Sequence, residues 1–595
     1  MSDFAYCSRA RERGALTREI CSIHAQNAPA VFEFHGAWGS LAASRNTYRG
    51  FDPFEDERYV CVVIGGPVLL FRDNMFLSGE DSSVGTKAML QRYLAGTLSL
   101  HEDLSGPFVF VCLDKKTRTL DVATDLMLFI PVYEYRHADE LVLSSHVDVA
   151  ARLSSRQHDL DMASIADFVM HGVVTYPFTA YSGVRQVKPA CVSMFDLSVP
   201  GARLTEQRTY WMPTETRGFA HLGQAAEMLR HGLLDYVGRV TEGMTEVAEF
   251  LSGGEDSRAV AGMLPARLKR DGYVFLDGMN REGRIAHKVA EAYGVDLHVH
   301  VRSPEHYAKI IADASRLVGF GHQYAHVHAL GLHAACGLDR YAAVFGGYLA
   351  DSLLKGAYIL KRKSVSRMHW VPEFFVPGET RTAEIRHPFL DPEVCREVTD
   401  RRRSHFQRVA ALRPKTAHEW FTLWPATMRA TIPFFHSNRR LFRSYEPFMN
   451  CQAVKLSATV PIQWKLNRRL FMAAVGPFLE KSRWIMHVDG YFPSLPWSAN
   501  VIPRQLLSLV RKFGRLTRTV TGTQGSWTDW RRLTGGATWA GYFETNKHAL
   551  HAIRSCFGPS GFSPERYSTL NSKLKMNLLQ VLVSLRKIEG DAEDV

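Results

Sequence analysis

The stretch Leu251-Ser252-Gly253-Gly254-Glu255-Asp256-Ser257-Arg258 lies between a predicted strand and a predicted helix, and it decides the fold of this chain. Residues 246–251 read as a strand that enters a core, and residues 259–264 read as the start of a buried helix. A strand, a glycine-containing turn and a helix N-terminus together bind anions, because free backbone N–H groups and the helix dipole both favour negative charge. The glycines permit close approach of the backbone, and the serines add hydroxyl donors. The stretch therefore predicts a phosphate site.

Asp256 is the unusual member of this loop, because a carboxylate repels a phosphate unless a cation such as Mg²⁺ lies between them. The loop lacks the lysine and the spacing of a Walker motif. Its Ser-Gly-Gly-x-Asp-Ser pattern instead resembles the pyrophosphate loop of the ATP pyrophosphatases, which split ATP between the α- and β-phosphates. An ordinary Ser-Gly-Gly turn is the alternative, and the strand–helix context argues against it.

Length and composition indicate a soluble, multidomain, cytoplasmic protein. A chain of 595 residues is too long for one core, and 46% hydrophobic with 22% charged residues is ordinary for a globular protein. The longest apolar run, residues 59–71, is broken by Gly-Gly-Pro, so we expect no membrane span, and the N-terminus has no signal-peptide pattern. Nine cysteines without a C-x-x-C pair favour a reduced compartment and no structural zinc.

Positive charge is concentrated near the C-terminus. The formal net charge is +12, and residues 502–535 hold seven Lys or Arg residues and one acid, Asp529. Such a segment is compatible with a nucleic-acid arm, a face for an acidic peptide or nucleotide, or a solvated basic face. No nucleic-acid-binding motif accompanies it, so we expect no nucleic-acid partner.

The first part of the chain, residues 1–210, is predicted to be a domain of packed antiparallel sheets. Residues 59–64 and 68–71 flank a Gly65-Gly66-Pro67 turn and are predicted to form a hairpin. Further short strands are expected at 106–114, 120–125, 131–135 and 141–145. Their order, including G-x-F-x-F-x-x-x-D and P-x-Y-x-Y segments, resembles the glutaminase domain of the asparagine synthetase family, which is an N-terminal-nucleophile (Ntn) hydrolase-like sandwich.

Departures from that family indicate that this domain has lost its activity. A glutaminase of this type uses an N-terminal cysteine whose own amine acts as base, but residue 2 is Ser and Cys7 is internal. The family's Asn-Gly oxyanion pair is replaced by Gly65-Gly66, which has no side-chain donor. We therefore predict no glutamine hydrolysis and no internal ammonia supply. The alternative is that Ser2 serves as a terminal nucleophile.

The second part, residues 211–595, is predicted to be an ATP-pyrophosphatase domain with a doubly wound parallel sheet and helical additions. Residues 222–240 and 282–293 have helical spacing, whereas 273–277 and 296–301 read as strands. Alternating strands and helices of this kind form a parallel sheet whose ligands bind at the carboxyl ends of the strands. The loop at 252–257 lies at such an end.

A second strand, Gly-Gly turn and acid occur in residues 342–352 and resemble the G-x-G-A-D segment of the asparagine synthetases, whose Asp binds magnesium. The resemblance implies that Asp256 and Asp351 together hold Mg²⁺, and chemistry agrees because two carboxylates can neutralise a departing pyrophosphate through the ion. Asp351 as a helix cap is the alternative. The ATP-binding residues predicted in this way are Leu251, Ser252, Gly253, Gly254, Asp256, Ser257, Phe275, Gly346 and Gly347.

Four residues are candidates for catalysis. Tyr348 stands where asparagine synthetases have a glutamate and where β-lactam synthetases have a tyrosine, paired with a glutamate, that deprotonates an attacking amine. Tyr titrates near pH 10, so a basic role needs a partner, for which Glu384 is the candidate; a surface pair between Glu384 and Arg386 is the alternative. The charge-stabilising lysine of the family corresponds to Lys465 or Arg468, with Lys465 slightly favoured.

A group of histidines raises the alternative of a metal site. His322, His326, His328 and His333 lie within residues 321–334, and His322 and His326 would share a face of a helix. No Glu accompanies them in an H-E-x-x-H arrangement, so we expect residues that line a pocket or the edge of the core.

The chain also resembles the lasso peptide cyclases, macrolactam synthetases that have asparagine synthetase architecture and lack the terminal cysteine. It implies adenylation of a side-chain carboxylate of a ribosomally made precursor peptide, with its core and possibly its leader bound. The N-terminal amine then closes an isopeptide ring, and AMP leaves. Holding the two groups together makes the closure effectively unimolecular. The implied cofactors are ATP and Mg²⁺, and the implied partners are a leader-binding protein and a transglutaminase-like protease.

Two alternatives remain from the sequence. The first is a small-molecule synthetase, such as a β-lactam synthetase or an ammonia-dependent asparagine synthetase, which would not need residues 480–595. The second is a non-catalytic scaffold with a relic ATP site, in which the acids at positions 256 and 351 would be expected to be lost.

Overall fold

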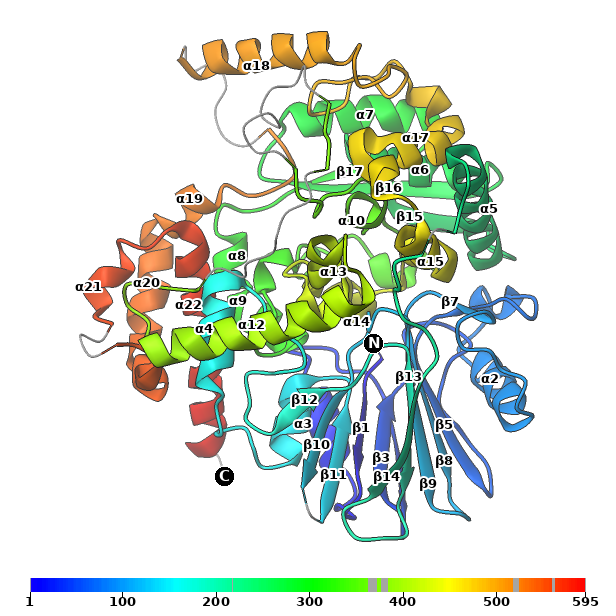
Figure 1. The fold of residues 1–595 in the computed structure, drawn as a ribbon, viewed down its shortest axis with the longest axis vertical. Coiled ribbons are helices and arrows are strands. Elements are labelled where there is room, and N and C mark those ends of the chain that lie inside the picture. The colour runs from blue at the N-terminus through cyan, green and yellow to red at the C-terminus, as the bar shows by residue number, and fades with distance from the viewer. Residues whose placement is uncertain are drawn as a thin grey trace.

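The computed structural model describes residues 2–137, 139–216, 218–361, 372–375, 384–516, 524–558 and 562–593. It has an N-terminal β-sandwich, a parallel α/β domain and a C-terminal group of helices (Figure 1). Every strand pair assigned within the sandwich sheets is antiparallel, and every pair in the third sheet is parallel. The predicted fold class is therefore confirmed.

The sandwich consists of two six-stranded sheets. The first has the order β12-β10-β11-β1-β3-β2 and the second has the order β14-β13-β9-β8-β5-β4. The strands of the first sheet are β1 (Phe4–Cys7), β2 (Val31–Gly36), β3 (Gly39–Ser44), β10 (Tyr133–His137), β11 (Glu140–Ser144) and β12 (Val184–Gln186). Those of the second are β4 (Phe54–Glu55), β5 (Tyr59–Gly65), β8 (Phe108–Asp114), β9 (Thr119–Thr124), β13 (Cys191–Asp196) and β14 (Arg203–Thr209).

The hairpin predicted across Gly65-Gly66-Pro67 is wrong. Strand β5 pairs with β4 and β8, whereas β6 (Val68–Leu69) pairs with β7 (Leu104–Ser105) in a separate small sheet. Both edges of β5 are therefore already occupied. Gly65 has a φ of 91°, and its carbonyl accepts a hydrogen bond from Asn46 Nδ2 (2.9 Å), so the chain turns out of the sheet at this point.

The α/β domain has a five-stranded sheet in the order β17-β16-β15-β18-β19. Its strands are β15 (Glu246–Phe250), β16 (Lys269–Leu276), β17 (Asp296–Val301), β18 (Val344–Phe345) and β19 (Ser444–Tyr445). The helices around it include α5 (Leu222–Val240), α6 (Glu255–Met263), α7 (Arg281–Tyr293) and α10 (Ala350–Leu354). Helix α7 ends where the expected Gly294 adopts the left-handed conformation, which a glycine accommodates without strain.

The C-terminal helices pack back onto the sandwich rather than only onto the α/β domain. Helix α22 (Ser572–Glu593) contacts α4 (Met162–His171) and α9 (Ile311–Val318), and α12 (Pro392–Leu412) also contacts α4 (Figure 1). Asn577 Nδ2 donates to the carbonyls of Phe168 and Val169, which lie at the end of α4. The C-terminal helices therefore pack on the N-terminal domain as well as on the α/β domain.

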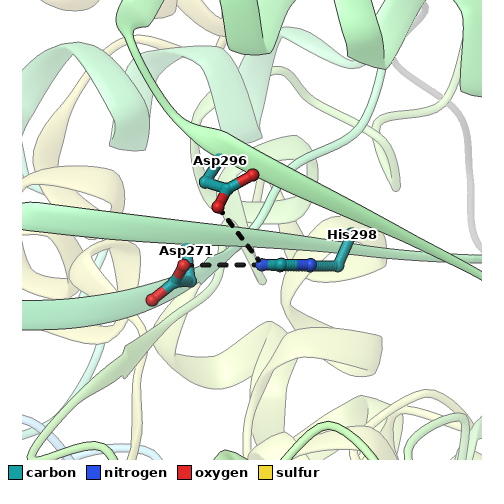
Figure 2. A group of neighbouring side chains, drawn as sticks. All are labelled: Asp271, Asp296 and His298. Atoms are coloured by element: carbon teal, nitrogen blue, oxygen red, sulfur yellow. Dashed lines mark hydrogen bonds and ion pairs between the residues drawn. The ribbon is translucent and has the colours of Figure 1, made fainter.

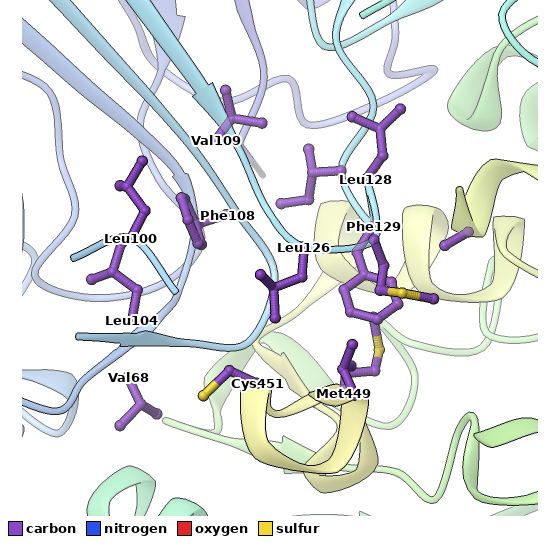
Figure 3. Close-up of a cluster of buried hydrophobic side chains, with 14 of the residues drawn as sticks. Val68, Leu100, Leu104, Phe108, Val109, Leu126, Leu128, Phe129, Met449 and Cys451 are labelled. Carbon is purple, nitrogen blue, oxygen red and sulfur yellow. The ribbon is translucent and has the colours of Figure 1, made fainter. Parts of the chain in front are cut away.

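The sandwich and the α/β domain share one apolar core. Figure 3 shows Val68, Leu104 and Phe129 of the sandwich close to Met449 and Cys451 of the second domain, and all five are buried. Among the described residues, no helix is both long and apolar enough to cross a membrane.

A buried ionic cluster also fixes the start of the chain at this interface. The Asp3 carboxylate accepts from Arg440 Nε (2.8 Å), Arg440 Nη2 (2.7 Å) and Arg439 Nη2 (3.1 Å) of α14 (Pro433–Leu441). Arg439 also donates to the carbonyl of Ser2. Burial alone would raise the pKa of Asp3, but the two guanidinium groups outweigh it and hold the pKa well below its usual range.

Candidate active site

The loop between β15 and α6 lies at the carboxyl end of the parallel sheet, as predicted. Ser257 lies in the first turn of α6, and its hydroxyl accepts from Ser252 N (3.1 Å). Ser252 Oγ in turn accepts from Gly254 N (3.1 Å), and Gly253 N donates to Glu282 Oε1 (2.7 Å). The loop is thus held by its own side chains in a form that presents the N-terminus of α6. An N-terminus of this kind favours a negatively charged ligand.

Asp256 and Asp351 lie on two different helices but converge on one cation. Lys355 Nζ is 2.6 Å from Asp256 Oδ1 and 2.5 Å from Asp351 Oδ1. Burial raises the pKa of Asp256 to about 7 even though the ammonium is adjacent, and Asp351 adds to the rise. Burial would lower the pKa of Lys355, but the two carboxylates outweigh it and raise the pKa. Two carboxylate oxygens that already surround a positive charge are a donor set that suits Mg²⁺.

The second glycine pair allows this close packing. A Cβ placed on Gly347 would lie 2.9 Å from Asp256 Cβ, and one on Gly346 would collide with the carboxylate of Glu446. The two turns predicted as a pair are therefore in contact in the fold.

A single cavity of about 1160 Å³ begins at the loop and extends across the carboxyl edge of the sheet. We call the part that contains the loop, Asp256, Asp351 and Lys355 its polar end. Ring contacts join Tyr348, Phe434, His328, Trp527 and His326, and we call this part its aromatic end. The aromatic end is lined by His326, His328, Tyr348, Tyr358, Phe434 and Trp527. Of the predicted ATP-binding residues, Leu251, Ser252, Gly254, Asp256, Ser257, Phe275 and Gly347 line the cavity, and Gly253 and Gly346 lie directly beside it.

Residues 524–530 cover part of this cavity. Thr528 Oγ1 donates to Asp277 (2.8 Å), and Arg302 donates to the carbonyl of Ser526. Trp530 packs on Tyr307 with 4.8 Å between ring centroids. The basic segment predicted at 502–535 therefore contributes a wall of the cavity through its last part. Its first part forms α18 (Val501–Leu516), and residues 517–523 lie outside the described residues.

Tyr348 faces the cavity, and its hydroxyl lies 3.0 Å from Thr431 Oγ1. Burial raises the pKa of Tyr348, while Arg429 and Thr431 oppose the rise. Its backbone N–H donates to Glu446 Oε2 (2.9 Å), so Glu446 is the carboxylate that the structure brings next to this residue.

The structure does not bring Glu384 to Tyr348. Glu384 is exposed and pairs with Arg386 at 2.8 Å, which is the surface pair considered as an alternative. Residues 362–371 and 376–383, which precede Glu384, lie outside the described residues.

The two candidate cations have different environments. Lys465 is 1% exposed, bonds to Glu419 (2.8 Å) and Ser457 (3.0 Å), and is not among the residues that line the cavity. Arg468 pairs with Glu255, which lies within the loop, and its guanidinium carbon is 4.1 Å from the ring centroid of Tyr491. Proximity therefore favours Arg468, contrary to the slight preference for Lys465.

The histidine group does not form a common metal site. The expected helix is only a short 3-10 turn, η2 (Tyr324–His326), and His322 is buried against His436 (5.4 Å between ring centroids). In the part of the chain that the structure describes, the metal-ligand geometry is met by Asp271, Asp296 and His298 (Figure 2). These lie at the opposite edge of the sheet, where Lys269 also approaches Asp271 (3.9 Å), so we interpret them as an ion-pair cluster.

Sequence reasoning missed Lys355 and Arg429. Lys355 follows Asp351 by four residues, a spacing that places the two on one helix face and could have indicated it. Arg429 lies in an irregular segment after η4 (Ala426–Met428), and only the folded chain places it beside Tyr348.

Two family models match this chain. The model described as asparagine synthase matches residues 228–488, and the model described as a glutamine amidotransferase domain matches residues 50–211. A sandwich similar to a glutamine amidotransferase domain therefore precedes a domain similar to asparagine synthase.

Individual relatives are distant. The chain is 26% identical over 344 residues to "Amidase chry2" of Gibberella zeae, and the match spans 51% of this chain and 50% of that protein. The chain thus spans about half the length of this curated relative. A solved structure of the allosteric regulatory enzyme of purine biosynthesis is 11% identical with a TM-score of 0.24, covering 51% of this chain and 80% of that one. Glutamine phosphoribosylpyrophosphate amidotransferase from B. subtilis is 10% identical with a TM-score of 0.24, covering 50% and 81%.

Proposed function

We propose that this protein is an ATP-dependent, AMP-forming macrolactam synthetase that activates a carboxylate of a precursor peptide and closes a ring with the peptide's N-terminal amine. The observation that carries the proposal is the cavity. Ligand pockets commonly have volumes of ~300–1,000 Å³, and this cavity of about 1160 Å³ exceeds that range. A cavity with a phosphate loop at one end and a large aromatic end suits a nucleotide together with a bulky second substrate.

The polar end would hold the nucleotide. Ser252, Ser257 and the N-terminus of α6 would bind phosphate, and Asp256 with Asp351 would hold Mg²⁺. When bound, the ion neutralises charge on the pyrophosphate as it departs. Lys355 lies between the two acids and would supply a further positive charge for the phosphates at this end. Arg468 would add positive charge to this end of the cavity, where it pairs with Glu255 of the loop.

The chemistry requires two bond changes at the carboxyl group. In the first, a carboxylate oxygen bonds to the α-phosphorus of ATP and the bond to pyrophosphate breaks. In the second, the amine nitrogen bonds to the acyl carbon, AMP leaves with its oxygen, and the nitrogen loses a proton. Tyr348 faces the cavity and would take part in that proton transfer as we propose it; burial raises its pKa, and Arg429 and Thr431 oppose only part of that rise. Glu384 has no part in the site as we propose it.

The absence of a glutaminase reaction is part of the proposal. Ser2 is fully buried, its carbonyl is bound by Arg439, and its hydroxyl lies 3.4 Å from Gly65 N. The amine must then come from the substrate itself. The leader-binding protein and the transglutaminase-like protease belong to the same proposal, as does a cytoplasmic location.

The decisive experiment is ATP–pyrophosphate exchange with precursor peptides encoded next to the gene. We expect exchange and AMP formation that depend on a peptide with a free N-terminus and a side-chain carboxylate. Asp256→Asn and Asp351→Asn should each abolish exchange, while Glu384→Gln, which alters an exposed carboxylate, serves as the control. AMP formation that depends on a small amino acid and ignores peptides would refute the cyclase assignment and leave a small-molecule amide synthetase.

A further inference from the structure

Arg429 is a buried arginine that the fold leaves largely unpaired inside the cavity. Its side chain lines the cavity, and the residue is only 4% exposed. Arg429 Nη2 donates to Thr431 Oγ1 at 3.0 Å. Nε and Nη1 are buried and have no hydrogen-bond partner among the described residues. A guanidinium in this state has lost its water without gaining a full set of acceptors, which is costly unless a ligand completes the set.

Arg302 shows what a fully partnered arginine looks like in the same cavity. It is 3% exposed, and it donates to Asp277 (2.9 Å), to the hydroxyl of Tyr307 (2.9 Å) and to the carbonyl of Ser526. A carboxylate therefore compensates the charge of Arg302. No Asp or Glu in the described chain lies within ion-pairing distance of Arg429, so its charge has no such partner.

Aromatic residues surround Arg429, and the hydroxyl of Tyr348 also interacts with it by hydrogen bonding, but Nε and Nη1 remain without an acceptor. The guanidinium carbon lies 5.5 Å from the ring centroid of Tyr348 and 5.2 Å from that of Tyr358. Cation–π contacts of this kind orient the group and offset part of the charge. They leave the N–H edge available to an acceptor that enters from the cavity.

The described neighbours of Arg429 in the cavity are largely aromatic. Its charge acts on His326, whose pKa is lowered to about 4 chiefly by burial and also by Arg429. The ring of His326 lies 5.7 Å from that of Trp527, in the aromatic end. The cations of the opposite end, Lys355 and Arg468, each pair with acids next to the loop. Arg429, unlike those two cations, has no acid partner among the described residues, so it is free to pair with an anionic group of the second substrate.

We propose that Arg429 is the receptor for a carboxylate of the acid substrate, held in the aromatic end of the cavity beside Tyr348. This inference rests on the proposed function in taking the aromatic end as the place of the second substrate, and it adds the recognised group and the residue that recognises it. An arginine suits this task because its planar N–H fork matches a carboxylate.

The test measures binding by the full-length protein rather than turnover. The probes are N-acetylglutamate α-amide, which carries one side-chain carboxylate, and its neutral isostere N-acetylglutamine α-amide. Binding is followed by calorimetry and by thermal stabilisation, with Mg²⁺ and α,β-methylene-ATP present. We expect the wild type to prefer the carboxylate probe. Arg429→Met should weaken carboxylate binding at least ~10-fold, the loss expected for a hydrogen-bonded charge, and remove the preference.

Two further measurements separate ligand binding from a structural role. Arg429→Met should leave the affinity for the ATP analogue unchanged and the melting temperature unchanged or higher, because an unpaired buried charge is removed. The matched control, Arg302→Met, should lower the melting temperature, because it leaves the carboxylate of Asp277 without its buried partner. Arg429→Lys, which keeps the charge but not the fork, provides a second variant if the methionine variant does not fold, and it should still lose most of the preference.

Three results would overturn the inference. They are equal binding of the two probes by the wild type, an unchanged carboxylate preference in the Arg429 variants, and a loss of affinity for the ATP analogue in place of the carboxylate. The last would assign Arg429 to phosphate. Failure of the macrolactam synthetase proposal gives a different outcome: no peptide supports exchange, while the carboxylate preference and its dependence on Arg429 persist.

Discussion

Replacement of Asp3 by Asn tests whether the sandwich has become a structural partner of the α/β domain. The substitution keeps the shape of the side chain and removes its charge. It leaves Arg439 and Arg440, which are 0% and 2% exposed, without the carboxylate that both of them contact. Ser145 Oγ also donates to this carboxylate (2.8 Å), so the variant disturbs one connected network.

The expected loss of stability follows from burial. Removing one partner of a buried ion pair typically costs ~3–5 kcal/mol, because the remaining charge is left unpaired in a medium of low polarity. A matched control is Asp139→Asn, which breaks the ion pair of Asp139 with Arg9. Those side chains are 57% and 51% exposed. An exposed pair contributes about 0–1 kcal/mol, so the loss of stability in Asp3→Asn should be several-fold larger than that in Asp139→Asn.

Urea denaturation followed by tryptophan fluorescence and circular dichroism would measure this difference. With an m-value of about 3 kcal/mol/M or more for a chain of this size, a loss of ~4 kcal/mol lowers the midpoint by roughly 1 M. The pH dependence gives a second check. The folded-state pKa of Asp3 is depressed, so its contribution is present above the unfolded value near 4 and is lost as the pH falls below it. Asp3→Asn should remove that part of the acid sensitivity.

The interpretation would be refuted if Asp3→Asn shifted the midpoint no more than Asp139→Asn does. A shift of the same size that left the acid limb unchanged would assign the effect to packing rather than to charge.

Three further predictions follow from single sites. Glu446→Gln should be as stable as the wild type near pH 4 and roughly 3 kcal/mol more stable at pH 8. Burial raises the pKa of Glu446 to about 7, so the wild type loses stability as the pH rises from 4.5 through 7, and the glutamine variant does not. Urea midpoints across this pH range measure the difference. Lys465→Met should destabilise the protein by ~3–5 kcal/mol, because it breaks the buried pair with Glu419, but it should leave the affinity for the ATP analogue unchanged. Arg468→Gln should reduce pyrophosphate exchange more than it reduces stability. Calorimetry and exchange assays distinguish the two variants. Ser2→Ala should leave ring closure unchanged, and neither protein should release glutamate from glutamine; release by the wild type alone would restore Ser2 as a nucleophile.

Local patterns in the sequence were sufficient for the α/β frame. The apolar spacing of residues 222–240 corresponds to α5, and residues 296–301 correspond to β17. The prediction succeeded because helix period, strand run and the glycine at position 294 are properties of adjacent residues. The loop at 252–257 could be placed for the same reason, since a strand and a helix define its position.

The parts that could not be predicted depend on residues far apart in the chain. Glu446 is brought to Tyr348 across 98 residues, whereas the nearer Glu384 remains at the surface. The hairpin at residues 59–71 failed because β8, more than forty residues later, occupies the edge of β5. The unpaired state of Arg429 is likewise invisible in the sequence, because it depends on which acids do not reach it.

The contact between α22 and α4 has a consequence for the synthesis of this protein. Asn577 bonds to the carbonyl of Phe168, 409 residues earlier in the chain. At a translation rate of roughly 10 residues per second, α22 is made about 40 s after α4, and α12, which also packs on α4, is made earlier. During that interval the part of α4 that α22 covers has no partner, while the sheets of the sandwich can already form. The nascent chain therefore presents a binding surface for chaperones that the finished enzyme does not have.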